Sequence, residues 1–235
     1  GPGRRVNQTQ GVDAIDVTAA QARGIAVSRT PDMFGDEVAD VAIGYAICLA
    51  RGLIGIHNSV ASGGWLKPNG FTLRGKTTVV VGLGSIGTAV AVRLLALGMN
   101  VRAVDPSPQA IEQARNLGIE LETLDDAAQD ANLLVTACPL TAETYGVVNA
   151  KVIARMGDPA WLVHVSRGPV VNMDDVRRSL DSGRLAGAAL DVYPEEPLPI
   201  SDPLRGHPNV IFGSHNGSHT REATLRASRA ALINL

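Results

Sequence analysis

Apolar residues recur along this chain in two different periods. In the first third they follow a helical period from Asp36 to about His57, at Val38, Val41, Ala42, Tyr45, Ala46 and Leu49. This period predicts one long helix with a single buried face. From Thr77 onward, short unbroken apolar runs alternate with further helical patterns. Unbroken runs predict strands buried on both faces, so the alternation is typical of an α/β fold with a doubly wound parallel sheet.

The pattern predicts the following elements. The strands are Thr78–Val81, Val101–Val104, Leu133–Ala137, Trp161–Val165, Ala188–Val192 and Val210–Phe212. The helices among and after them are Ser85–Leu97, Gln109–Asn116, Asp125–Gln129, Lys151–Met156, Asn172–Asp181 and Arg221–Leu235. A short helix over Thr18–Arg23 and a strand over Ile25–Val27 precede the long helix.

A glycine-rich segment, Gly82-Leu83-Gly84-Ser85-Ile86-Gly87, stands directly between the first of these strands and its helix. There Gly82 permits a tight turn, Gly84 lets the backbone approach a pyrophosphate, and Gly87 lets the helix sit close to the strand. The helix start at Ser85 and Ile86 offers N–H groups and a positive dipole end to phosphates. The segment therefore predicts a Rossmann dinucleotide-binding unit.

An acidic residue, Asp105, follows the next predicted strand at the interval that such a unit requires. A carboxylate there accepts hydrogen bonds from the ribose hydroxyls and repels a 2′-phosphate, which favours NAD over NADP. Arg102 lies close by in the sequence and leaves some tolerance of NADP open. The competing interpretation is a cluster of turn glycines with a capping aspartate.

Ionisable residues also gather after three later strands, in the segments 164–172, 189–197 and 209–220. Ligands of open α/β sheets bind outside the carboxyl ends of the strands, so these segments are expected to face the same crevice as the glycine loop. Together with Gly11-Val12-Asp13, Leu73-Arg74-Gly75-Lys76 and Pro139-Leu140-Thr141-Ala142-Glu143-Thr144, they resemble the D-isomer-specific 2-hydroxyacid dehydrogenases in order and spacing. The resemblance covers nearly the whole chain and implies NAD-dependent hydride transfer.

The resemblance implies three catalytic residues. Arg167 would hold the carboxylate and carbonyl oxygen of a 2-oxo acid, His215 would be the general acid and base, and Glu196 would orient and stabilise the imidazolium. Each has a plain structural interpretation as an ion-pair partner, a strand-end histidine or a surface carboxylate. Their joint occurrence at the family's spacing favours catalysis. His219 is a rival for His215, and Ser214 stands where the family has proline.

The family's other site positions fall on further residues of this chain. Asp191 matches the position that contacts the nicotinamide carboxamide, and Gln10 and Gly11 match the loop that holds the substrate carboxylate. With the glycine loop and Asp105, the implied cofactor-binding set includes Cys138, Val165, Ser166, Asp191, His215 and Gly217. No metal site is expected, because the two cysteines, Cys48 and Cys138, lie far apart without partner histidines.

The resemblance also implies a division of the chain. Residues 33–215 are expected to form the NAD-binding domain, with the helix 36–57 as a dimerisation helix. Residues 1–32 would be the end of the first half of a flavodoxin-like substrate domain, and residues 216–235 the start of the helix that returns to it. The chain starts only just before its Gly-Val-Asp motif, so most of that substrate domain is expected to be missing.

The composition of the chain limits the classes of partner that we expect it to bind. The 235 residues carry a formal net charge of −2, without a basic block, which argues against nucleic acid as a partner. No run approaches the roughly 18 apolar residues that span a bilayer, and two thiols without a disulfide pattern fit the cytoplasm. We expect an NAD-dependent homodimeric oxidoreductase of a D-2-hydroxy acid, namely 3-phosphoglycerate or a related acid of the glycerate and hydroxypyruvate type. Two alternatives are an NAD-sensing, corepressor-like interaction protein, and a chain that binds NAD but turns over poorly.

Overall fold

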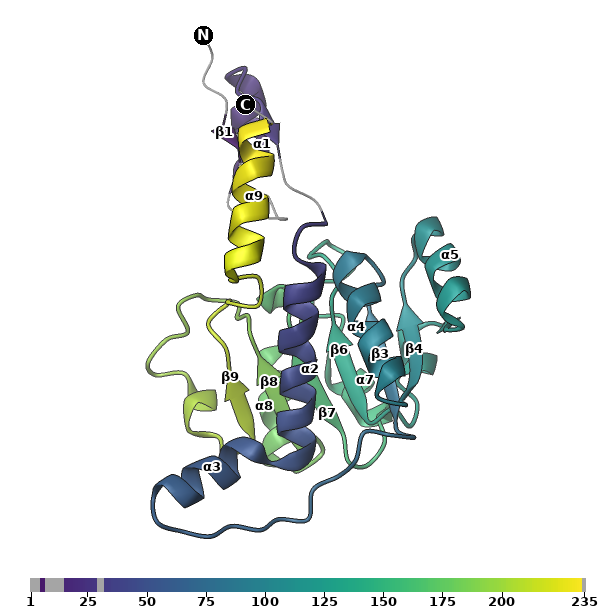
Figure 1. Cartoon of the computed structure of the whole chain (residues 1–235), viewed down its shortest axis with the longest axis vertical. Coiled ribbons are helices and arrows are strands. Elements are labelled where there is room, and N and C mark those ends of the chain that lie inside the picture. Colours follow the sequence, from purple (N-terminus) through teal and green to yellow (C-terminus); the bar gives the residue numbers. More distant parts are fainter. Residues whose placement is uncertain (1–4, 7–14, 29–31, 234–235) are drawn as a thin grey trace.

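A seven-stranded parallel sheet forms the centre of the structure (Figure 1). The computed structural model describes residues 5–6, 15–28 and 32–233. The strands lie in the order β5-β4-β3-β6-β7-β8-β9, and every neighbouring pair is parallel. Their bounds are β3 Thr77–Val81, β4 Asn100–Val104, β5 Glu120–Leu121, β6 Leu133–Thr136, β7 Trp161–His164, β8 Gly187–Leu190 and β9 Val210–Phe212. The predicted α/β fold with a parallel sheet is confirmed.

Helices cover both faces of this sheet. They are α2 Gly35–Arg51, α3 Leu53–Ala61, α4 Ser85–Ala96, α5 Pro108–Leu117, α6 Leu124–Ala127, α7 Ala150–Arg155, α8 Met173–Asp181 and α9 Arg221–Ile233, with short 3₁₀ turns at Gly168–Val170 and Pro203–Gly206. Ahead of them, α1 Val17–Ala22 lies between β1 Arg5–Val6 and β2 Val27–Ser28, which form a separate two-stranded parallel sheet. Figure 1 shows α9 extending away from the seven-stranded sheet, at the end of the molecule that also holds α1 and β1.

Two hydrophobic cores lie on opposite faces of the sheet. Strand β3 shows why, because successive side chains of a strand point to opposite faces. Val80 belongs to the core that contains the buried residues of α2 and α4, whereas Val79 and Val81 belong to the core under α6, α7 and α8. Helix α2 contributes a row of alanines to the first core, at positions 39, 42, 46 and 50. Small side chains at helical spacing let α2 lie close to α4 and to β7.

The predicted single helix over residues 36–57 is wrong in one respect, because it breaks at Gly52. This residue adopts a left-handed conformation with φ 62°, and α3 leaves α2 at an angle of 69°. Glycine enters this region without the steric cost that other residues incur. Among the described residues no single helix is both long and apolar enough to cross a bilayer, and α2 and α3 pass that test only as a bent pair.

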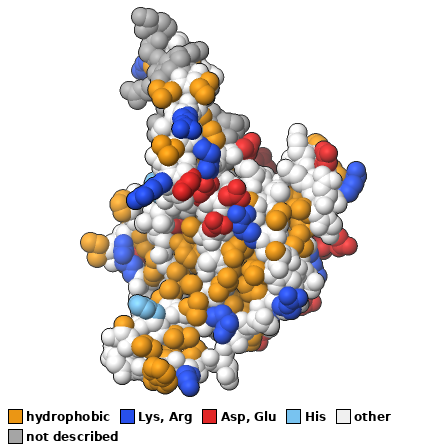
Figure 2. Space-filling view, viewed as in Figure 1, with side chains coloured by type: hydrophobic (Ala, Val, Ile, Leu, Met, Phe, Trp, Pro, Cys, Tyr) orange, Lys and Arg blue, Asp and Glu red, His pale blue; other side chains and the backbone are white. Residues whose placement is uncertain are grey.

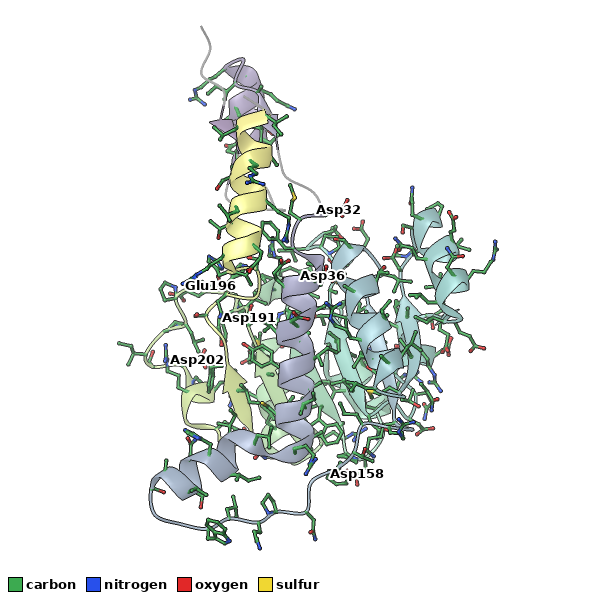
Figure 3. All side chains as sticks on the ribbon, viewed as in Figure 1. Asp32, Asp36, Asp158, Asp191, Glu196 and Asp202 are labelled. Carbon is green, nitrogen blue, oxygen red and sulfur yellow. The ribbon has the colours of Figure 1, made fainter. Side chains whose placement is uncertain are left out.

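The loops that follow β3, β7, β8 and β9 all emerge at the carboxyl edge of the sheet, because the strands are parallel. The chain passes from β3 to β4 on one side and later returns to β6 on the other side. Such a reversal opens a crevice outside the strand ends, where ligands of this fold class bind. Strand order therefore brings the glycine loop and the three later segments to one edge. Asp191 and Glu196 both lie near that edge (Figure 3).

The last residue of β7, His164, is completely buried within this framework. Its Nδ1 lies 2.6 Å from Thr136 Oγ1, and its Nε2 lies 3.4 Å from the carbonyl oxygen of Gly168. A neutral ring that accepts at Nδ1 and donates from Nε2 satisfies both contacts. Burial lowers the pKa of His164 to about 4, because the charged ring would lose its hydration.

We predict that His164 makes the fold less stable in mild acid. An exposed histidine in the unfolded chain has a pKa of about 6.5, so the unfolded state takes up this proton first as the pH falls. The free energy of unfolding should therefore decrease between about pH 6.5 and about pH 4, by on the order of 3 kcal/mol from this residue. Urea unfolding at several pH values should show a weaker pH dependence for His164→Gln than for the parent. Equal pH dependence of the two proteins would rule this out.

Candidate active site

The glycine loop between β3 and α4 has two glycines that the fold itself requires. Gly82 has φ +93°, and a Cβ there would lie 2.6 Å from the Cα of Cys138, at the end of β6. A Cβ on Gly87 would collide with the carbonyl oxygen of Gly82. Both positions therefore hold α4 tightly against the strand ends.

Gly84 differs from its two neighbours, because nothing in the protein requires a glycine there. Its φ of −72° is open to any residue, and a Cβ would meet no atom within 4 Å. It caps α4 without a side-chain hydrogen bond. The space beside Gly84 is therefore free for a ligand, and the start of α4 points its positive dipole end there. This arrangement fits the pyrophosphate of a dinucleotide.

Asp105 lies at the end of β4 and also holds the glycine loop. Its Oδ2 accepts the N–H of Leu83 at 2.7 Å, and its Oδ1 accepts the N–H of Ser107 at 2.8 Å. Arg102 is turned to other partners: it donates to the carbonyl oxygens of Ala127 and Gln129 and lies 3.6 Å from Glu122. In the sequence analysis, Arg102 was the reason that some tolerance of NADP stayed open. In the structure its guanidinium is bound to partners beside α6.

The structure brings the three predicted catalytic residues to neighbouring strand ends. Arg167 follows β7, Glu196 follows β8, and His215 follows β9. His215 Nδ1 lies 2.7 Å from Glu196 Oε2, while Glu196 Oε1 accepts the N–H of Tyr193 at 2.9 Å. The Glu196 carboxylate is therefore anchored through Oε1, and through Oε2 it orients the imidazole ring of His215. His215 adopts a left-handed backbone with φ 57°, an unusual conformation for this residue type that marks a constrained turn.

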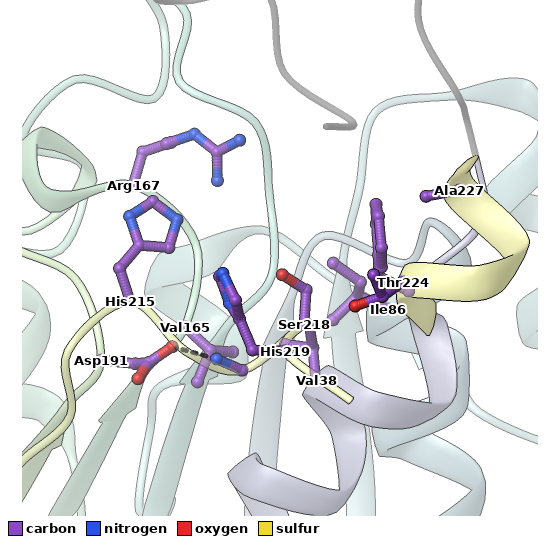
Figure 4. A pocket seen from close by; sticks show the side chains of 12 residues that line it. Val38, Ile86, Val165, Arg167, Asp191, His215, Ser218, His219, Thr224 and Ala227 are labelled. Carbon is purple, nitrogen blue, oxygen red and sulfur yellow. Dashed lines mark hydrogen bonds between the residues drawn. The ribbon is translucent and has the colours of Figure 1, made fainter. Parts of the chain in front are cut away.

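A cavity of about 590 Å³ opens beside these residues. Figure 4 shows Arg167, His215 and His219 with their side chains directed into the same space, while Ile86 and Thr224 approach from the side of α4 and α9. The described residues that line it are Phe34, Val38, Ile86, Val165, Arg167, Asp191, His215, Gly217, Ser218, His219, Thr224 and Ala227. The cavity thus joins the helix of the glycine loop to Arg167 and His215.

The remaining predicted residues occupy different parts of this edge. Val165 lines the cavity, whereas Ser166 is buried and donates its hydroxyl to Thr136 Oγ1 at 3.3 Å. Cys138 lies under the glycine loop, where burial raises the pKa of its thiol to about 11 and keeps it protonated. Gln10 and Gly11 lie outside the described residues.

Residues that we did not predict for the site support the turn that carries Arg167. The buried ring of His164 contacts the carbonyl oxygen of Gly168 through Nε2. A Cβ on Gly168 would collide with the backbone of Tyr193 and Pro194, so the turns after β7 and β8 are in direct contact. Arg167 also donates from Nη1 to the carbonyl oxygen of Ser166 at 2.8 Å. The only signal in the sequence was a histidine at the end of an apolar strand, and this usually indicates packing.

Comparisons with known proteins agree with this geometry. Residues 43–217 match the family "D-isomer specific 2-hydroxyacid dehydrogenase, NAD binding domain". A glyoxylate reductase of Thermofilum pendens is 35% identical over 231 residues, which cover 96% of this chain and 68% of the relative. A D-3-phosphoglycerate dehydrogenase of Archaeoglobus fulgidus is 36% identical over 92% of this chain and 41% of its own length. The apo structure of Escherichia coli D-lactate dehydrogenase superposes with a TM-score of 0.88 at 29% identity, over 98% of this chain and 73% of that one.

The chain therefore belongs to the D-isomer-specific 2-hydroxyacid dehydrogenase family. It is an NAD-dependent oxidoreductase of 2-hydroxy acids, and its cofactor is NAD(H). The glycine loop and the open space beside Gly84 fit that cofactor. Held beside Gly84 by the glycine loop and the start of α4, this cofactor would supply the hydride-transfer chemistry that links a 2-hydroxy acid to its 2-oxo acid.

We predict that two glycine substitutions separate cofactor binding from folding. Gly84→Ala should leave the melting temperature nearly unchanged, because its Cβ meets no protein atom. It should weaken NADH binding by about tenfold or more, because the methyl group enters the pyrophosphate space. Gly87→Ala should lower the melting temperature instead, because its Cβ collides with Gly82. Thermal unfolding and titration of NADH fluorescence test both variants. Unchanged NADH affinity in Gly84→Ala would contradict the assignment.

Proposed function

We propose that this enzyme interconverts a D-2-hydroxy acid of the glycerate type and its 2-oxo acid, with hydroxypyruvate or glyoxylate as the oxo acid. The observation that carries the proposal is the 2.7 Å contact of His215 with Glu196, together with the cavity that His215 and Arg167 line. The name of the Thermofilum pendens relative, a glyoxylate reductase, supports the substrate class. Nothing in the described site favours the corepressor-like alternative.

Each residue of the proposed site has a role that follows from its chemistry. Arg167 has a planar guanidinium that binds the substrate carboxylate through paired hydrogen bonds and polarises the carbonyl oxygen. During reduction, His215 donates its proton to that oxygen as hydride reaches C2, and it takes the proton back during oxidation. The negative charge of Glu196 stabilises the imidazolium and holds Nδ1, which leaves Nε2 to face the substrate.

The charge of the cavity favours an acid with a single negative group. Among the described residues that line it, Arg167 is the only arginine or lysine. Arg167 is committed to the C1 carboxylate, so a distal phosphate would find no permanent cation on these walls. Binding sites for phosphate groups ordinarily supply one or more. We therefore favour the unphosphorylated acid over 3-phosphoglycerate.

We predict that His215→Gln lowers kcat for hydroxypyruvate reduction by about 10²- to 10⁴-fold, the usual contribution of a general acid. His219→Gln, a histidine of the same cavity, should lose less than about tenfold. Steady-state assays that follow NADH at saturating substrate measure both variants. A larger loss in His219→Gln than in His215→Gln would exchange the two roles.

A substrate panel tests the second part of the proposal. With the parent enzyme, hydroxypyruvate and glyoxylate should give a kcat/KM at least about tenfold above that of 3-phosphohydroxypyruvate, a difference of about 1.4 kcal/mol in transition-state binding. The reverse order would reject the unphosphorylated class while leaving the catalytic roles in place.

We also propose that the enzyme is a homodimer that associates through residues 53–71, the apolar arm formed by α3 and the loop after it. The sequence predicts this surface on the helix 36–57 together with Trp65. Residues 53–57 and Trp65 belong to the arm, whereas the buried residues of α2 face the domain's own core. The apolar side chains exposed on the arm are Leu53, Ile54, Val60, Trp65, Leu66 and Phe71. Figure 2 shows hydrophobic side chains gathered at the bottom of the molecule, where Figure 1 places α3. Contiguous exposed apolar surface of this kind marks interaction sites.

Substitutions on the arm test the dimer. Trp65 is 76% exposed, and buried tryptophans at interfaces often contribute about 2 kcal/mol or more to binding. Trp65→Asp should therefore raise the dimer dissociation constant by about thirtyfold or more. Ile200→Asp, which changes a 94% exposed side chain outside the arm, is the matched control. Light scattering coupled to gel filtration should give twice the chain mass for the parent and the control, and a monomeric parent would reject the proposal.

A further inference from the structure

The carboxylate of Asp191 lies buried at the centre of the turn that carries His215, with only 2% of the residue exposed. Its Oδ2 accepts the N–H of Gly217 at 3.0 Å, and its Oδ1 lies 3.4 Å from the N–H of Asn216. The backbone carbonyl of Asp191 accepts the N–H of His215 at 2.7 Å. Asp191 thus holds the turn from its side chain and its backbone together.

Neutral donors must stabilise this buried charge. Among the described residues, no arginine, lysine or histidine forms an ion pair with Asp191. A buried carboxylate without a cationic partner depends on its hydrogen bonds, and its orientation follows the donors around it. The backbone N–H groups above belong to the turn itself. A donor from outside the turn would tie the carboxylate itself to another part of the domain.

Tyr45 supplies that outside donor. It lies on α2, and its hydroxyl oxygen is 3.4 Å from Asp191 Oδ1. Burial and the adjacent carboxylate both raise the pKa of Tyr45, so the hydroxyl stays protonated and donates. Helix α2 packs on β7 and β8, so its position is fixed by packing in the hydrophobic core.

Gly213 makes this contact possible. A Cβ at position 213 would collide with both Asp191 Oδ1 and the hydroxyl of Tyr45. Gly213 is not among the glycines with positive φ, so its backbone conformation does not require glycine. Asp191 and the hydroxyl of Tyr45 both occupy the space that a side chain at position 213 would need. The hydroxyl of Tyr45 thus lies where a side chain on Gly213 would lie, although the two residues are far apart in the sequence.

We propose that Tyr45 is a positioning residue of this dehydrogenase, which orients the carboxylate of Asp191 from α2 and thereby the nicotinamide end of the site. The inference rests on the proposed function through Asp191 and His215, which line the cavity together. Tyr45 does not line the cavity among the described residues, and it acts through Asp191. Its loss should affect the cofactor more than the acid substrate.

Tyr45→Phe removes the hydroxyl and leaves the ring that packs on the core. We expect the dissociation constant and the KM for NADH to rise by about tenfold, the effect of losing one hydrogen bond to a charged group. The KM for hydroxypyruvate should stay within about twofold, and the melting temperature should stay close to that of the parent. Tyr145→Phe is the matched control, because Tyr145 is 71% exposed and should behave as the parent. Parent-like NADH affinity in Tyr45→Phe would overturn the proposal, and so would a uniform loss of all parameters together with melting temperature.

A double-mutant cycle gives a second, independent test. Gly213→Ala alone should weaken NADH binding, because the new methyl group displaces Asp191 and Tyr45. In the Tyr45→Phe background the same substitution should cost less, since one of the two colliding atoms is gone. Strict additivity of the two effects would overturn the proposal.

Asp191→Asn separates this inference from the proposed function. If Asp191→Asn weakens NADH binding and Tyr45→Phe does not, the role of Tyr45 is rejected and the site assignment stands. If neither Asp191→Asn nor His215→Gln changes binding or turnover, the proposed function itself fails.

Discussion

The close packing of Gly87 against the carbonyl oxygen of Gly82 is the contact on which the rest of the site depends. It brings the start of α4 onto the end of β3 with no side chain between them. The start of α2 approaches the same place, since a Cβ on Gly35 would lie 3.1 Å from the carbonyl oxygen of Ser85. Asp105 then holds the loop through the N–H of Leu83. The two fold-required glycines thus position the loop, and the space beside Gly84 stays open.

The parallel sheet converts this local packing into a site. Its strands are buried on both faces and provide a firm base, whereas Arg167, Glu196 and His215 stand on loops at the carboxyl edge. Those loops are held by polar contacts: His164 with the carbonyl of Gly168, which is fully buried, and two part-buried contacts, Tyr193 with Glu196 and Tyr45 with Asp191. The buried contact of His164 has little water around it and few alternative partners, so it favours one arrangement of the turn at Gly168.

Much of this arrangement could be predicted from the sequence because its signals are local. Apolar runs and helical periods located the strands and helices from Thr77 onward to within a few residues, and the glycine loop was placed between the correct strand and helix. The spacing of Arg167, Glu196 and His215 assigned them to three strand ends. The two-residue strand β5 carries too few residues for such a signal. The break at Gly52 was missed because the apolar period continues through it, although the helix direction changes.

By itself, then, the sequence determined the elements, the dinucleotide loop and the residue types available for chemistry, since each depends on neighbours within a few positions. Only the tertiary structure decided which groups meet. Tyr45 and Gly213 lie far apart in the chain, and no periodicity relates them, yet both are adjacent to Asp191. Arg102 is the converse case. Its position in the sequence suggested a contact with the cofactor, but in the structure its hydrogen bonds hold it beside α6. Contacts between distant segments follow from strand order and packing, and these are properties of the whole chain.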